Sequence, residues 1–386
     1  MDIQIGMGKQ GRRAWGFDDI AIVPSRRTRD PDDIDLSWQI DAYRFELPLM
    51  ASAMDSAVSP ATAIEIGRLG GLAVLNLEGL WTRYDDPTPM FEEIASLKAD
   101  VATRRMQEIY RQPVDPDLIG QRITEMREGG IVTAASITPQ KVEEYAHLTV
   151  AAGLDVLVVQ GTVVSAEHVS TRTKPLDLKD FISGFDLPVI VGGVASYSTA
   201  LHLMRTGAIG VLVGVGPGTA CTTRGVLGIG VPQATAIADA AGARTRYLEE
   251  SGRYVHVIAD GGMRTGGDLA KAIACGADAV MIGSPLAAAD QAPAKGMHWG
   301  MATFHATLPR GTRVEVGRLG TLEEILLGPA LENDGTRNLF GALRTSMATT
   351  GYADVKEFQH AEVMVAPALQ SEGKTLQRSQ HVGMGS

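Results

Sequence analysis

The sequence predicts an α/β protein built as a (β/α)8 TIM barrel, and two observations predict it. From Pro48 onward, short runs of β-branched or apolar residues alternate with segments of helical period, as in repeated βα units around a parallel sheet. Eight such runs can be counted, and several are almost wholly apolar. Strands buried on both faces fit a closed barrel better than an open sheet with one solvated face.

The predicted elements follow one another in regular order. The strands are expected at Leu49–Ser52, Leu72–Leu75, Ile131–Ala135, Val156–Val159, Val189–Val191, Gly210–Val213, Val255–Ala259 and Ala279–Ile282. The helices that follow them are expected at Pro60–Leu69, Pro139–Ala152, Tyr197–Thr206, Gln233–Ser251 and Gly267–Cys275. The carboxyl ends of barrel strands meet on one rim, so the active site is expected there.

One long segment departs from this repeat. Between the second and third strands the pattern predicts helices at Met90–Tyr110 and Pro116–Glu128 with Pro-rich joints. The polar end of the chain, Gln370–Ser386, would be disordered in isolation. We therefore expect a single catalytic domain over residues 1–386, composed of a barrel at about 45–295, a helical insertion at 76–130 and a C-terminal extension at 296–386.

Composition narrows the class of partner. The 386 residues carry a formal net charge of −10 without a Lys/Arg-rich run, which argues against nucleic acid or an anionic membrane surface as partner. No apolar stretch approaches the roughly 20 residues that span a bilayer, and the N-terminus lacks a signal-like apolar region. We expect a cytoplasmic protein that acts on small metabolites.

The two cysteines have different contexts, so neither a disulfide framework nor a zinc site is predicted. Cys275 lies late in an amphipathic helix among small residues, which indicates a buried structural thiol. Cys221 lies in the run GVGPGTACTTR, with glycines on one side and hydroxyl and cationic groups on the other. A reactive thiolate needs such a setting, so Cys221 is a candidate nucleophile, with a small residue packed in a tight turn as the alternative.

Four stretches of the sequence together resemble the motifs of one enzyme family. GVGPGTACTTRGVLGIGVPQATAI and VIADGGMRTGGDLAKAIACGADAVMIGSPLA resemble the cysteine loop and the ribose- and phosphate-binding stretch of the IMP dehydrogenase/GMP reductase family. PLMASAMDSAVSPATAIEIGRLGGLAVLN resembles that family's first two barrel units, and HWGMAT resembles the segment that carries its YRGMGS motif. The resemblance covers most of the chain from Asp18 to about Tyr352.

The resemblance implies a role for each matching residue. Cys221 would add to C2 of a purine nucleoside monophosphate, GMP or IMP, and Thr223 would handle protons beside it. Asp260 would accept both ribose hydroxyls, and Thr219 would contact the phosphate through its hydroxyl. Further substrate contacts are expected from Ser52, Met54, Gly193, Gly262, Gly283, Ser284, Gly300 and Met301.

The resemblance also implies cofactors and an assembly. Hydride would be exchanged with NADPH or NAD, with Gln160, Gly214 and Gly216 on the cofactor side. A monovalent cation, K⁺ by expectation, would be held by Gly216, Gly218 and Cys221, together with Glu372 from the next subunit. The expected assembly is therefore a homotetramer, with an octamer as the larger alternative.

Three departures from the family pattern guide the choice of reaction. Residues 76–130 are too few for the pair of CBS domains that IMP dehydrogenases usually carry there. Gln160 stands where the family has an Asp that contacts the cofactor ribose, so a more anionic cofactor such as NADPH would be tolerated. The short run after Met301 lacks the Arg-Tyr pair with which IMP dehydrogenases activate water, and it places Arg310 where GMP reductases have a Glu.

GMP reductase is therefore the favoured reaction, since it activates no water. The alternatives are an IMP dehydrogenase that uses an unrecognised base such as Arg310 or Arg313, an FMN-dependent barrel oxidase, and a paralogue that binds nucleotide without turnover.

Overall fold

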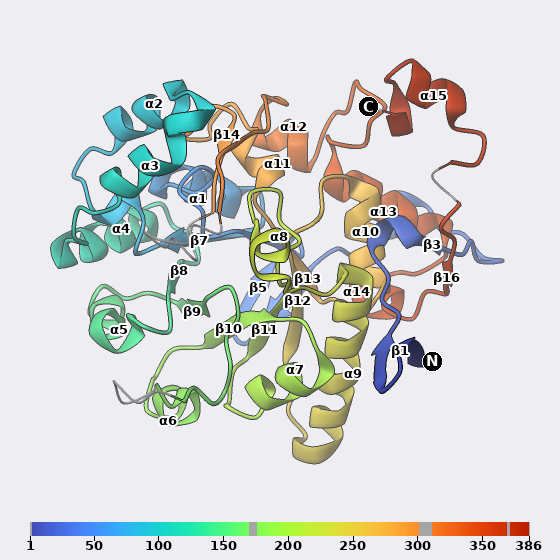
Figure 1. The fold of residues 1–386 in the computed structure, drawn as a ribbon, viewed down its shortest axis with the longest axis horizontal. Coiled ribbons are helices and arrows are strands. Elements are labelled where there is room, and N and C mark those ends of the chain that lie inside the picture. Colours follow the sequence, from blue (N-terminus) through green and yellow to red (C-terminus); the bar gives the residue numbers. More distant parts are fainter. Residues whose placement is uncertain (1, 170–175, 301–310, 369–370, 386) are drawn as a thin grey trace.

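The computed structural model describes residues 2–169, 176–300, 311–368 and 371–385, and its centre is a closed barrel of parallel strands (Figure 1). Strands β6 to β13 follow one another around the barrel in chain order, and β13 pairs with β6 to close it. The barrel strands are β6 Leu49–Ala51, β7 Leu72–Asn76, β8 Ala134–Ile137, β9 Val156–Gln160, β10 Val189–Val194, β11 Gly210–Val213, β12 His256–Asp260 and β13 Ala279–Ile282. The predicted (β/α)8 barrel is confirmed.

Most strand bounds lie within a residue or two of the predicted ones, and the third strand differs most. It was expected at Ile131–Ala135, whereas β8 begins only at Ala134. The reason lies at Thr133, whose backbone N–H and hydroxyl both donate to the carboxylate of Asp155 at 2.8 Å. With its N–H bonded to a side chain, Thr133 lies just outside the ladder that begins at Ala134.

The barrel interior is filled by apolar side chains from alternate strand positions. A hairpin of β4 (Trp38–Ile40) and β5 (Tyr43–Phe45) packs Trp38, Ile40 and Phe45 against this interior layer. The interior layer comprises Met50, Leu72, Val74, Ala134, Val156, Val158, Ile190, Leu212, Ile258, Ala279 and Met281. The barrel is therefore a packed core, with room for a ligand only beyond its ends.

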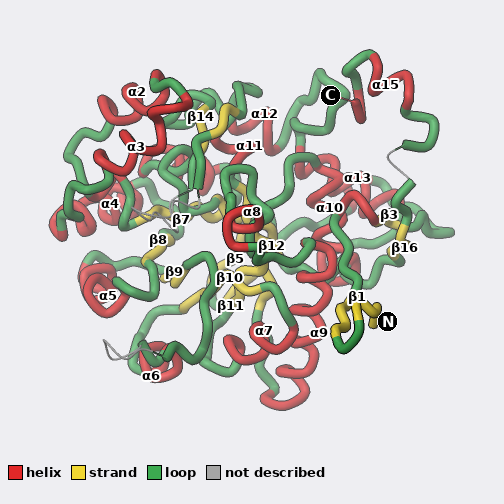
Figure 2. Tube along the Cα trace, in the orientation of Figure 1, coloured by secondary structure: helices red, strands yellow, loops and turns green. Residues whose placement is uncertain are grey.

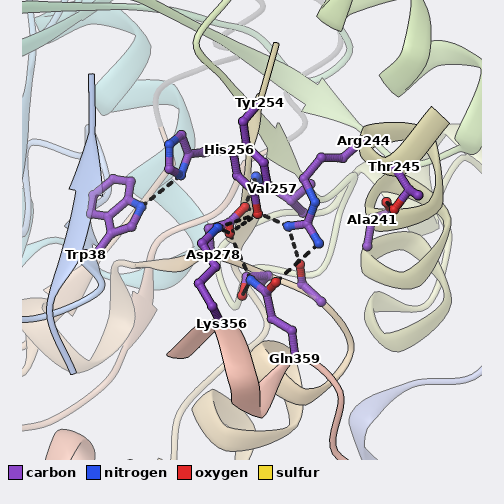
Figure 3. A network of polar contacts seen from close by, with 12 residues as sticks. Trp38, Ala241, Arg244, Thr245, Tyr254, His256, Val257, Asp278, Lys356 and Gln359 are labelled. Atoms are coloured by element: carbon purple, nitrogen blue, oxygen red, sulfur yellow. Dashed lines mark hydrogen bonds and ion pairs between the residues drawn. The ribbon is translucent and has the colours of Figure 1, made fainter. Parts of the chain in front are cut away.

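A buried polar network secures the amino ends of β12 and β13 (Figure 3). Asp278, fully buried just before β13, accepts hydrogen bonds from Arg244, Tyr254, Val257, Lys356 and Gln359. Burial alone would raise the pKa of Asp278, but the cations Arg244 and Lys356 hold it well below its usual range. Because Lys356 and Gln359 come from the C-terminal extension, the network ties that extension to the barrel.

The helices surround the strands (Figure 2). Those that follow barrel strands are α1 Pro60–Arg68, α5 Val142–Ala151, α6 Leu178–Ser183, α7 Tyr197–Met204, α8 Thr223–Leu227, α9 Gln233–Ser251, α10 Gly266–Ala274 and α11 Ser284–Ala287. Ser59 and Thr265 begin α1 and α10 as N-caps, each accepting a hydrogen bond from the backbone three residues on.

The insertion after β7 contains α2 Thr88–Ser96, α3 Ala99–Ile109 and α4 Pro116–Glu128 on one side of the barrel (Figure 1). The prediction of one helix over Met90–Tyr110 is wrong, because the backbone is extended at Leu97 and Lys98. The carbonyls of Ile94 and Leu97 at this break accept hydrogen bonds from Arg313 instead of from the next helical turn.

Most of the C-terminal extension lies on the opposite side from the insertion, whereas its first strand lies beside the insertion (Figure 1). It includes β14 Met297–His298, β15 Val314–Glu315, α12 Leu322–Leu326, α13 Leu339–Thr349, α14 Val355–Phe358, β16 Val363–Val365 and α15 Thr375–Ser379. Strand β16 pairs with β3 (Ile20–Ile22) from the N-terminal part of the chain. A separate hairpin of β1 (Asp2–Gly6) and β2 (Lys9–Arg12) precedes β3. Within the described residues, single turns of 3-10 helix lie at Phe17–Asp19, Pro31–Asp33, Leu80–Thr82 and Gly383–Gly385.

Candidate active site

A pocket opens at the carboxyl ends of the barrel strands, on the rim where the sequence places the active site. Its floor and walls come from the loops after β6, β9, β11, β12 and β13, and from both sides of the β14–β15 pair. The predicted site residues that line it are Ser52, Met54, Gln160, Gly214, Gly216, Gly218, Thr219, Cys221, Asp260, Gly262, Gly283, Ser284 and Gly300. Residues far apart in the sequence are thus gathered around one cavity.

Cys221 lies half-buried on the loop between β11 and α8, with its thiol in the pocket wall. Its backbone N–H donates to the carbonyl of Gly218 at 3.0 Å, which folds the loop back on itself. The thiol donates to the Thr223 hydroxyl at 3.2 Å. When the thiol loses its proton, the same hydroxyl is placed to donate to the thiolate, because a hydroxyl can act in both senses.

Thr223 does not line the pocket itself. It is fully buried at the start of α8, directly behind the thiol of Cys221. Arg224 follows it and donates to the carbonyls of Val215 and Val231, so its charge lies close to the loop that carries Cys221. Burial lowers the pKa of Arg224, and the nearby Cys221 opposes that shift.

Asp260 ends β12, with its carboxylate facing Gln160 at the end of β9. The Gln160 amide donates to Asp260 Oδ2 at 3.2 Å. Burial raises the pKa of Asp260 to about 7, and the hydrogen bond from Gln160 offsets part of that rise. Gln160, expected on the cofactor side, therefore contacts the residue expected to bind ribose.

Small residues from three loops form one end of the pocket. The hydroxyls of Thr219 and Ser284 lie 2.9 Å apart, although one follows β11 and the other follows β13. Gly261 and Gly262 have φ angles of 79° and 80°, a region that residues with a Cβ rarely adopt. Hydroxyl groups and exposed backbone amides of this kind suit an anionic group such as a phosphate.

Besides Thr223, two predicted site residues in the described part of the chain, Gly193 and Glu372, do not line the pocket. Gly193 lies in β10, outside the pocket lining. Its N–H donates to the Gly161 carbonyl at 2.9 Å. Glu372 is exposed between β16 and α15 and does not line the pocket of its own chain. Met301 lies outside the described residues.

The sequence reasoning missed two buried polar residues beside the pocket. His298 lines it, and its Nδ1 lies 2.9 Å from the Ser56 hydroxyl. Burial lowers the pKa of His298 to about 4, so the ring is neutral near pH 7. The signal was present, since His298 begins the HWGMAT stretch.

Gln233 is the second residue. Its amide donates to the carbonyls of Val213, Asp260 and Gly261, so it joins the ends of β11 and β12 below the cysteine loop. Only its place directly after the cysteine loop, at the start of α9, could have drawn attention to it.

Among the described residues, no group of three or more His, Cys, Asp or Glu side chains is placed to hold a metal ion. No helix in the described part of the chain is both long enough and apolar enough to cross a membrane.

Comparison with known proteins agrees with this geometry. The family model for the IMP dehydrogenase / GMP reductase domain matches residues 14–314, most of the chain. The chain belongs to the IMP dehydrogenase/GMP reductase family. An uncharacterized oxidoreductase of Mycolicibacterium smegmatis is 50% identical over 372 residues, which cover 94% of this chain and 99% of that protein. An inosine-5'-monophosphate dehydrogenase of Methanocaldococcus jannaschii is 26% identical over 489 aligned residues, with 94% and 95% coverage.

A solved structure shares both fold and sequence with this family member. It is an IMP dehydrogenase/GMP reductase-like protein from Corynebacterium glutamicum, with a TM-score of 0.90 and 46% identity over 94% of this chain and 97% of that one. The family resemblance seen in the sequence is thus confirmed, as is the branch without CBS domains, since the helices α2 to α4 occupy the connection between β7 and β8.

Proposed function

We propose that this protein is an oxidoreductase that acts at C2 of a purine nucleoside monophosphate through a covalent adduct with Cys221. The observation that carries the proposal is the pocket that joins the Cys221 thiol, its Thr223 partner and the Asp260 carboxylate. A thiolate is the nucleophile that adds to an electron-poor ring carbon, and a neighbouring hydroxyl can pass protons at the same centre.

The remaining pocket residues suit the two ends of a mononucleotide. The Asp260 carboxylate can accept hydrogen bonds from both ribose hydroxyls, and the Thr219 and Ser284 hydroxyls with the amides near Gly262 and Gly283 can hold the phosphate. Ser52, Met54 and Gly300 would form walls around the base. Met301 and Gly193 are proposed as substrate contacts on the family resemblance alone. A nucleotide held at both ends presents its base to Cys221 in one orientation.

We place the hydride partner beside Gln160. Gln160, Gly214 and Gly216 line the same cavity, and the glycines let a planar ring approach the backbone closely. A bound nicotinamide, NADPH or NAD, would supply or accept the hydride. Since Gln160 is uncharged, it places no carboxylate where the extra phosphate of NADPH would add negative charge.

The same loop has carbonyls for a monovalent cation, K⁺ by our proposal. Gly216, Gly218 and Cys221 would contribute them, and Glu372 of a neighbouring subunit would complete the site in a homotetramer or octamer. The fit rests on Gly216, whose φ of 77° turns the backbone within the loop. Oxygen ligands of this kind are those that hard cations bind in proteins.

For the direction of the reaction we propose GMP reduction. Cys221 would add to C2 of GMP, ammonia would leave with a proton, hydride would reach C2, and expulsion of the thiolate would release IMP. This sequence needs no activated water. In the dehydrogenase the adduct must be hydrolysed, and Arg313 was one of the two residues considered as a base for that step. Its guanidinium instead donates to three backbone carbonyls of the insertion, which disfavours that role.

IMP dehydrogenase is the second candidate, favoured by the names of relatives such as the Methanocaldococcus jannaschii enzyme. In that direction IMP, NAD and water would give XMP and NADH. One experiment separates the candidates. The near-ultraviolet absorbance of reduced nicotinamide is followed in the presence of potassium, once with GMP plus NADPH and once with IMP plus NAD. Both assays are run on the wild type and on Cys221→Ala. Loss of absorbance with GMP supports the reductase, and a rise with IMP supports the dehydrogenase. Equal rates in Cys221→Ala contradict the adduct in both.

A further inference from the structure

The helical insertion contacts the active site through the β14–β15 pair. These two short strands are antiparallel, with Met297 opposite Glu315 and His298 opposite Val314. Gly300 follows β14 and Gly311 precedes β15, and both glycines line the pocket. The position of this strand pair therefore sets one wall of the pocket.

The strand that returns from the pocket is held by Arg313. Its guanidinium donates to the carbonyls of Ile94, Ala95 and Leu97, the last at the residue that ends α2. Carbonyls at a helix C-terminus lack partners within the helix and carry partial negative charge, so a cation is well placed there. The planar guanidinium can serve several acceptors at once, which a lysine ammonium cannot do in the same geometry.

The outgoing strand is held by Trp299. The indole Nε1–H donates to the Tyr110 hydroxyl at 2.9 Å, and that hydroxyl donates to Asp55 Oδ2 at 2.6 Å. Trp299 is 1% exposed and packs on Phe91 with ring centroids 6.0 Å apart. Together with Leu80, Ile94, Met106, Ile109 and Ala294 these rings form a separate buried apolar cluster.

From Arg313 the contacts continue to the nucleophile loop. The backbone N–H of Thr312 donates to the Ala220 carbonyl at 3.0 Å, and Gly311 forms an isolated β-bridge with Cys221. A Cβ on Gly311 would lie 3.1 Å from the Gly300 carbonyl, so both strands and the cysteine loop meet closely. A shift of Arg313 is thereby passed to Cys221 through two adjacent residues.

We propose that the helical insertion is a fixed platform for the active site and that Arg313 is its positioning residue, setting the orientation of the Cys221 loop. The proposal rests on the proposed function insofar as Cys221 is taken as the nucleophile. The carbonyls of α2 hold Arg313, Arg313 holds the strand that carries Gly311 and Thr312, and those two residues hold Ala220 and Cys221.

The test compares Arg313→Met and Arg313→Lys with Arg318→Met. Arg318 lies five positions further on and is exposed, and its guanidinium lies 4.0 Å from the Asp290 carboxylate, so it is a matched control. Iodoacetamide alkylation of the free protein is followed separately at Cys221 and Cys275 by peptide mass. Burial raises the pKa of the Cys275 thiol to about 12, so its slow alkylation reports general loosening of the fold.

We expect the alkylation rate of Cys221 to change by about five-fold or more in both Arg313 variants, while Cys275 stays at its wild-type rate. We expect kcat to fall by roughly 10 to 100-fold with little change in nucleotide affinity, because small displacements of a reacting group are costly. Arg318→Met should match the wild type. Unchanged Cys221 alkylation, or equal acceleration of both thiols, overturns the proposal. If Arg313→Met does not fold, Arg313→Lys decides alone. Turnover that survives Cys221→Ala would contradict the proposed function while leaving this comparison of alkylation rates valid.

Discussion

The hydroxyl of Thr219 lies 2.9 Å from the hydroxyl of Ser284, although 65 positions separate them. Each follows a different barrel strand, and both line the same end of the pocket. Two hydroxyls that bond to each other can both turn and donate to an incoming anion. This pair therefore marks the phosphate end of the proposed mononucleotide site.

Removing these hydroxyls should weaken nucleotide binding specifically. We expect Thr219→Val and Ser284→Ala each to reduce GMP affinity by roughly 10 to 100-fold, because hydrogen bonds to charged groups contribute about 1.5–3 kcal/mol. Binding of guanosine, which lacks the phosphate, should change by less than about two-fold on the same reasoning. Isothermal titration of both ligands measures this. Equal losses for nucleotide and nucleoside would place the phosphate elsewhere.

The state of Asp260 should make nucleotide binding depend on pH. Burial raises its pKa to about 7, whereas ribose hydroxyls donate to the ionised carboxylate. Binding thus favours loss of the proton, so affinity should rise with pH up to about 7, by at most about 10-fold per pH unit, and level off above about 8.

Asp260→Asn supplies the control for this pH dependence. The variant keeps the pocket shape and the titration of the nucleotide phosphate but lacks the titrating carboxyl group. Its affinity should be lower and should change less between pH 6 and 8, as measured by titration with GMP. Identical pH profiles for the wild type and the variant would show that another group is responsible.

Thr223 should control proton transfer at Cys221 rather than nucleotide binding. It is buried behind the thiol and shares a 3.2 Å hydrogen bond with it. Thr223→Val keeps the branched shape and removes the hydroxyl, so kcat should fall by about 10²- to 10⁴-fold with GMP affinity nearly unchanged. Steady-state kinetics with the substrate that gives turnover measures the split. A rise in KM alone, with kcat kept, would instead assign Thr223 to binding.

How far the sequence predicts this molecule differs between the barrel and its surroundings. The strands were predictable because their apolar runs are local, and the pocket residues because Gly-rich stretches and the cysteine loop occur in recognisable order. The helix break at Leu97 was not, because Arg313, more than 200 positions away, bonds the carbonyls there. The pairing of Ser56 with His298 and the bond from Gln160 to Asp260 were hidden for the same reason.

The buried network around Asp278 was equally hidden, and it should dominate the stability of the barrel end opposite the pocket. Asp278→Asn leaves Arg244 and Lys356 without their carboxylate, and removing one partner from a buried ion pair costs about 3–5 kcal/mol. The free energy of unfolding, from urea titrations at pH 7, should fall by that amount. Asp290→Asn removes a half-exposed carboxylate 4.0 Å from Arg318 and should change it by less than about 0.5 kcal/mol.

The same network predicts the sign of a pH effect. Because the pKa of Asp278 is held below its value in the unfolded chain, its contribution is fully present above the unfolded pKa of about 4 and is lost as pH falls below it. Wild-type stability should therefore decline more steeply than that of Asp278→Asn in urea titrations between about pH 5 and 3. Parallel declines would mean that the surrounding cations do not depress this pKa, and that Asp278 acts through the hydrogen bonds it accepts from Tyr254, Val257 and Gln359.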